Sequence, residues 1–339
     1  MDTTNKTRAT SHDEAREMPQ PRLYVIRADF CMSAYILHAL DSDDRICMIE
    51  YKKRKTSLAD KVLRWLRAYV VTRKGLWTDR ILDHDLLAML PTISPQDKVL
   101  LFGVENMKDL SIILQETEAR DCTIFMWNTV KSRYEGRLKK TGFRSFVKNT
   151  RADVCTFDPH DADHYHLRLL NQVYRYPETF EDRASADYDI FYIGMDKHRS
   201  EQLAHIKNMM EQLRLDFYIL KDKDTREDSR LAGSYHDTPL AYEDVLKRIQ
   251  RSRAILEILQ EGQDGSTLRA LEALFLRRKL ITNNRSIKDV DFYCPDNILV
   301  LDQETTASDI SQFLQTPMAA VPEEIIQKYN IISWIQQFL

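Results

Sequence analysis

Short apolar runs alternate with amphipathic stretches along this chain, and the alternation occurs twice. Each run has four to six residues, which suits a strand buried on both faces, and the stretches between the runs have helical periodicity. This order is typical of parallel sheets covered by helices on both faces. The first series of runs is LYVI (23–26), ICMI (46–49), VLLF (99–102), TIFM (123–126) and VCTF (154–157). The second is DIFYIG (189–194), DFYIL (216–220), AILEI (254–258), KLIT (279–282) and NILVL (297–301).

A polar, acid-rich stretch with Pro177 separates the two series. A chain of 339 residues also fits two domains better than one. We therefore predict an α/β protein of two Rossmann-like domains, with ligands bound in a cleft at the carboxyl ends of the strands. The expected parts are a flexible leader (1–20), an N-terminal domain (21–176), a linker (177–188), a C-terminal domain (189–320) and an amphipathic terminal helix (321–339).

Composition excludes several classes of protein. The 49 basic residues are balanced by 52 acidic ones, for a net charge of −3, which argues against a nucleic-acid binder that works by bulk positive charge. No apolar stretch approaches the roughly 18 residues of a membrane-spanning helix. The five cysteines are scattered without CxxC spacing, as expected for reduced thiols in a cytoplasmic protein.

The segment AILEILQEGQDGSTLRALEALFLRRKLITNN (254–284) carries the most chemistry. A buried strand leads into a polar turn, and a helix follows that Ser266 or Thr267 can cap. With Gly265 in the turn, the free N–H groups at the start of this helix form an anion site suited to a diphosphate. Arg269, in the first turn, can add a forked contact to phosphate oxygens.

Glu272 lies further along the same helix, eight residues after Asp264. If the face formed by Leu268, Leu271 and Leu274 packs inward, Glu272 is short of solvent. Its carboxylate is then well placed to accept hydrogen bonds from the two hydroxyl groups of a ribose. The alternative is a capped amphipathic helix with a surface acid.

A second candidate segment is FYIGMDKHRSEQL (191–203). A strand ends near Gly194, and Lys197 and Arg199 follow at a helix start. Basic groups in that position face the expected cleft and can neutralise a diphosphate. The alternative is a solvated helix start with incidental bases.

Residues 254–284 together with DFYCPDNILVLD (291–302) resemble the donor half of nucleotide-sugar glycosyltransferases of the GT-B fold. More narrowly, they are similar to bacterial transferases of lipopolysaccharide core and capsule synthesis. The resemblance covers residues 188–302 and implies that Glu272 contacts the nucleotide ribose and that Asp264 stands near the donor sugar. It also implies a phosphate role for residues 265–267 and a terminal helix that crosses back onto the N-terminal domain.

The resemblance also implies the activity, which is transfer of a sugar from a nucleotide-sugar substrate without a metal ion or a cofactor. The acceptor would be a surface glycan or a lipid-linked glycan of the lipopolysaccharide type. An inverting transferase needs a general base near the acceptor hydroxyl. Asp29 and Glu105, each just after an apolar run of the N-terminal domain, are the candidates for that base.

A basic run over residues 131–151 contains eight lysine and arginine residues and one glutamate. It predicts either a solvated helix face or a surface that docks an anionic acceptor or membrane headgroups. The second alternative would place a cytoplasmic enzyme at the inner face of the membrane.

Three alternatives compete with a GT-B glycosyltransferase. The two domains can form a nucleotide sensor or scaffold without turnover. A metal-dependent GT-A transferase would carry an Asp-x-Asp pair just after a strand. DSDD (41–44) precedes a strand and KDKD (221–224) follows one, so only KDKD is admissible, but the GT-A fold is a single α/β unit. A dinucleotide-dependent oxidoreductase is disfavoured because no GxGxxG follows a strand.

Overall fold

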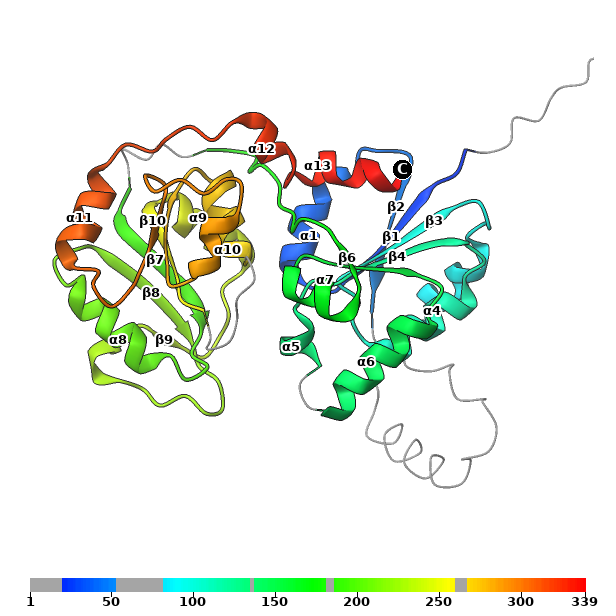
Figure 1. Ribbon diagram of the computed structural model, residues 1–339, viewed down its shortest axis with the longest axis horizontal. Helices are drawn as coiled ribbons and strands as arrows, with labels where there is room; N and C mark the ends of the chain where they lie inside the picture. The colour runs from blue at the N-terminus through cyan, green and yellow to red at the C-terminus, as the bar shows by residue number, and fades with distance from the viewer. Residues whose placement is uncertain (1–19, 53–81, 135–136, 181–185, 260–266) are drawn as a thin grey trace, which may run out of the picture.

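The computed structural model describes residues 20–52, 82–134, 137–180, 186–259 and 267–339. Figure 1 shows two α/β domains side by side. Each contains a six-stranded sheet in which all paired strands are parallel. The predicted α/β class with two Rossmann-like domains is therefore confirmed.

The first sheet has the strand order β2-β1-β3-β4-β5-β6. Its strands are β1 (Leu23–Ala28), β2 (Ile46–Tyr51), β3 (Lys98–Phe102), β4 (Asp121–Phe125), β5 (Asp153–Thr156) and β6 (Arg168–Leu169). The helices of this domain are α1 (Cys31–Leu37), α3 (His84–Met89), α4 (Met107–Glu116), α5 (Val130–Arg133), α6 (Arg137–Asn149) and α7 (Pro159–Tyr165). The helical pattern expected over 57–71 lies outside the described residues.

The second sheet has the strand order β12-β11-β10-β7-β8-β9. Its strands are β7 (Tyr188–Met195), β8 (Leu215–Leu220), β9 (Tyr235–His236), β10 (Ser252–Glu257), β11 (Lys279–Thr282) and β12 (Ile298–Val300). Its helices are α8 (Ser200–Met209), α9 (Tyr242–Gln250), α10 (Leu268–Phe275) and α11 (Ala307–Gln315). Each of the ten apolar runs forms a strand, and among the described residues the strands that the sequence did not predict are the two-residue β6 and β9.

The terminal segment forms α12 (Glu323–Gln327), α13 (Ile331–Trp334) and a 3-10 turn (Ile335–Phe338) in place of one continuous helix. The break occurs where Tyr174 hydrogen-bonds to the backbone on both sides of Asn330. Beyond it, the Trp334 ring packs on Phe102 and Phe125 of the first sheet, with centroids 6.1 and 5.0 Å apart. The predicted return of the chain end to the N-terminal domain is confirmed (Figure 1).

One apolar cluster continues from the first domain into the second. It includes Phe102 of the first sheet, Tyr174 between the domains, Phe191 and Phe275 of the second domain, and Trp334. Two further clusters stay within one domain each. The domains are thus joined by packed side chains as well as by the chain itself. Among the described residues, no helix combines the length and the apolar character needed to cross a bilayer.

Candidate active site

The start of α10 is fixed by a buried acid at the end of β10. Thr267 caps the helix by accepting from the Arg269 N–H at 3.1 Å, and its hydroxyl donates to Glu257. The other carboxylate oxygen of Glu257 accepts from Thr282 at 2.5 Å. Burial raises the pKa of Glu257. Glu257 therefore connects β10, β11 and α10. The sequence analysis did not predict this role, although an acid inside the apolar run AILEI was the available signal.

Glu272 is fully buried and so is Leu271, whereas Leu268 and Leu274 are half-buried. One carboxylate oxygen of Glu272 pairs with the guanidinium of Arg269, and the other accepts from the Tyr242 hydroxyl at 2.7 Å. The Tyr242 hydroxyl in turn lies 2.6 Å from that of Tyr174. Both oxygens of Glu272 are thus engaged by protein, and the predicted contact to ribose stays a prediction.

Burial, together with the nearby Glu272 carboxylate, raises the pKa of Tyr242 well above its ordinary value. Tyr242 therefore stays protonated and donates to Glu272, while Tyr174 donates to Tyr242. The chain of hydroxyl groups holds the carboxylate, and the carboxylate holds Arg269.

These contacts orient Arg269 but engage only some of the N–H donors of its guanidinium. Its side chain is 22% exposed, and Glu272 is its one side-chain partner in the described part of the chain. A guanidinium has five N–H donors, so donors remain for an anionic ligand. The sequence predicted an anion site at this helix start, and the structure brings Thr267 and Arg269 together there. Asp264, Gly265 and Ser266 lie outside the described residues.

The carboxyl end of β7 carries the second predicted segment. The Arg199 guanidinium donates to the backbone carbonyls of Met195, Asp196 and Ile258, and so joins the ends of β7 and β10. These contacts hold its positive charge at the sheet edge. At Gly194, a Cβ would lie 2.9 Å from the Tyr192 hydroxyl and 3.2 Å from Arg199 Nη2, so a side chain there would require Tyr192 and Arg199 to shift.

Lys197 and its neighbour His198 both have left-handed backbone, with φ of 44° and 64°. This conformation is uncommon for residues other than glycine and is found at functional sites. The Lys197 N–H donates to Asp222 at 2.8 Å, which fixes the loop, and its side chain is exposed. Although the residue is exposed as a whole, partial desolvation of its amine, together with the nearby Arg199, lowers the pKa of Lys197.

The two predicted bases occupy different surroundings. Asp29 is exposed just after β1. Glu105 is buried, and its Oε1 accepts from the N–H groups of Trp127 and Asn128 at 2.9 and 2.7 Å. Its Oε2 accepts from the Asn128 amide and pairs with Arg133 at 3.3 Å. Burial raises the pKa of Glu105. The contacts of Glu105 give it a structural role in the turn after β4, and the part of either residue as a base stays a prediction.

Asp158, His160 and Asp161 bring three potential metal-ligand atoms within 4.8 Å of one another. Asp158 accepts from the Asp161 N–H at 2.8 Å and caps α7, and Asp161 accepts from the Val130 N–H at 2.6 Å. These contacts explain both acids as helix caps. The expectation that the protein needs no metal stays a prediction.

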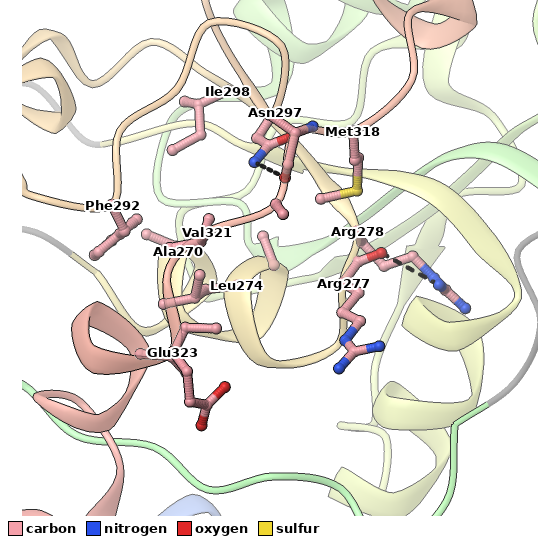
Figure 2. A pocket seen from close by; sticks show the side chains of 14 residues that line it. Ala270, Leu274, Arg277, Arg278, Phe292, Asn297, Ile298, Met318, Val321 and Glu323 are labelled. Carbon is pink, nitrogen blue, oxygen red and sulfur yellow. Dashed lines mark hydrogen bonds between the residues drawn. The ribbon is translucent and has the colours of Figure 1, made fainter.

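A separate cavity of 430 Å³ lies on another face of α10, beneath the segment that returns to the N-terminal domain (Figure 2). Its wall is mainly apolar, with Arg277, Arg278 and Glu323 as charged members. The Asn297 side chain is satisfied by two hydrogen bonds to the backbone of Ala319. Because its polar groups are few and mostly paired, this cavity is a weaker candidate for a nucleotide site than the start of α10.

No family model matches the chain, and no curated protein sequence is similar to it. Solved structures do match. HepE from Anabaena, in complex with UDP-glucose, is 9% identical, with a TM-score of 0.56 over 93% of this chain and 98% of that one. Sucrose-phosphate synthase from Thermosynechococcus elongatus is 10% identical, with a TM-score of 0.53 over 93% and 97%. TarM is 9% identical with a TM-score of 0.45, and this chain spans 55% of its length. The likeness to HepE and to sucrose-phosphate synthase shows that the chain has the two-domain GT-B fold.

Proposed function

We propose that this protein is a glycosyltransferase that moves a sugar from a nucleotide-sugar donor to a glycan acceptor. The observation that carries the proposal is the start of α10. There a fully buried Glu272 orients Arg269, and the guanidinium keeps donors for an anion. The GT-B fold supports it, because HepE holds UDP-glucose in the same fold.

In this proposal the donor diphosphate binds at the capped helix start, where N–H groups, the helix dipole and Arg269 favour negative charge. Charge on the diphosphate grows as its bond to the sugar breaks. Arg269 and the helix start are fixed beforehand by Glu272 and Glu257, so they stabilise that charge without rearranging. Lys197 and Arg199 at the end of β7 add to the positive electrostatic potential around the diphosphate. This arrangement supplies the stabilisation without a metal ion.

The N-terminal domain then supplies the acceptor side, with a surface glycan or lipopolysaccharide-type glycan as the acceptor. Asp29 is the exposed candidate for the base. Docking at the cytoplasmic face of the membrane would use the basic run over residues 131–151, most of which lies on α5 and α6. Within that run, Arg151 is committed to the protein, because it donates to the carbonyls of Leu114, Thr117 and Ala119.

Calorimetry with UDP, GDP, TDP and CMP tests the donor site. The variant Arg269→Lys keeps the charge beside Glu272 but loses the forked geometry. The control Arg277→Lys makes the same change at an exposed residue just beyond the far end of α10. We expect one nucleotide to bind wild type, Arg269→Lys to weaken it about 10- to 100-fold, and the control to leave it unchanged. If no nucleotide binds, or both variants behave alike, the proposal fails.

A further inference from the structure

Tyr192 is a buried tyrosine of β7 that the proposed mechanism has not used. Its side chain is 2% exposed, and its ring packs against Phe217 with centroids 5.5 Å apart. Residues two apart on a strand share a face, so the ring extends past Gly194 toward the carboxyl end of β7. The close approach of its hydroxyl to Gly194, 2.9 Å from the Cβ position there, shows this direction.

The hydroxyl of Tyr192 has no hydrogen-bond partner in the part of the chain that the structure describes. Buried polar groups in folded proteins are nearly always paired, so an unpaired hydroxyl at the end of a central strand calls for an explanation. A ligand that supplies the missing acceptor is one explanation, and its chemistry is set by the neighbouring groups.

The Arg199 guanidinium lies near this hydroxyl. Arg199 Nη2 is 3.2 Å from the same Cβ position of Gly194. Burial raises the pKa of Tyr192, while the charges of Arg199 and Arg269 act in the opposite direction and Asp196 raises it further. Tyr192 therefore remains protonated and offers a donor beside the Arg199 guanidinium. An acceptor that fits beside this cation is an anionic oxygen.

We infer that the Tyr192 hydroxyl donates a hydrogen bond to a phosphate oxygen of the nucleoside diphosphate. This inference rests on the proposed function and adds a binding residue to the same site. Gly194 is then required because any side chain there would displace the hydroxyl. The contact favours the diphosphate and contributes nothing to recognition of the nucleoside itself.

Calorimetry with UDP and uridine tests this inference, with GDP and guanosine or TDP and thymidine used if one of those diphosphates is preferred. The variant Tyr192→Phe removes one unpaired oxygen, so its melting temperature should equal or exceed that of wild type. The control Tyr218→Phe, on the neighbouring strand, removes a hydroxyl that donates to the Thr238 carbonyl at 2.6 Å. We expect Tyr192→Phe to weaken diphosphate binding about 5- to 20-fold, to leave nucleoside binding unchanged, and Tyr218→Phe to change neither.

Three results overturn the inference. Unchanged diphosphate affinity in Tyr192→Phe, with wild type binding normally, removes Tyr192 from the site and leaves the proposed function standing. A lower melting temperature together with equal losses for diphosphate and nucleoside shows that the hydroxyl is structural. If wild type itself binds no nucleoside diphosphate, the inference fails, and the proposed function fails with it unless CMP binds.

Discussion

Replacing Tyr242 with phenylalanine tests whether a hydroxyl donor holds the buried Glu272 carboxylate. The change removes the oxygen that donates to Glu272 at 2.7 Å and contacts Tyr174 at 2.6 Å. The phenyl ring keeps its packing against Tyr35, whose ring centroid is 5.2 Å away. The effect of the substitution is therefore confined to hydrogen bonds.

The expected cost follows from the two bonds lost. A hydrogen bond to a charged group contributes about 1.5–3 kcal/mol, and the neutral bond from Tyr174 contributes about 1 kcal/mol. We expect Tyr242→Phe to lower the free energy of unfolding by about 2–4 kcal/mol. Tyr174→Phe loses only the neutral bond and should cost about 1 kcal/mol.

Urea unfolding followed by tryptophan fluorescence measures both costs, with the slope of the transition expected to stay constant. In a Glu272→Gln background both lost bonds are neutral, so Tyr242→Phe should cost about 2 kcal/mol, the low end of the wild-type range. If Tyr242→Phe costs no more than Tyr174→Phe in the wild-type background, Glu272 is not held as a charged acceptor, and the orientation of Arg269 needs another explanation.

Two further predictions concern other parts of the fold. Trp334→Ala should lower the free energy of unfolding by about 3–5 kcal/mol, because it empties a packed aromatic site on the first sheet. The control Ile332→Ala, at an exposed position, should change that free energy little. Equal effects of the two substitutions would refute the docking of the chain end. Burial raises the pKa of Glu257, so the native state binds that proton more tightly than the unfolded chain does. Stability should therefore fall as pH rises above the ordinary value of 4.5, and fall less steeply in Glu257→Gln; parallel pH profiles would contradict this.

The strands were predictable because each buried run leaves a local pattern. The two-residue strands β6 and β9 leave none, since Arg168–Leu169 and Tyr235–His236 are extended only through pairing with β5 and β8. The break in the terminal segment was also not predictable from the sequence, because it depends on a bridge between Tyr174 and Asn330.

In the candidate site, too, local patterns were predictable and distant partners were not. Residue type and spacing predicted Thr267, Arg269 and Glu272 as site residues, and these three lie on one helix. The partner of Glu272 was not predictable, because Tyr242 comes from another helix, 30 residues away in sequence. For Arg199, the sequence gives charge and position but not its partners, and the structure shows three backbone carbonyls around its guanidinium.

The most direct test of glycosyl transfer is the release of nucleoside diphosphate or monophosphate from a panel of nucleotide sugars, with purified lipopolysaccharide or capsular glycan as acceptor. The proposed function predicts that one nucleotide sugar releases its nucleotide, that the glycan gains the mass of one sugar, and that Arg269→Lys slows both together. Nucleotide binding without release from any nucleotide sugar would contradict the account and identify the protein as a nucleotide sensor with a GT-B fold.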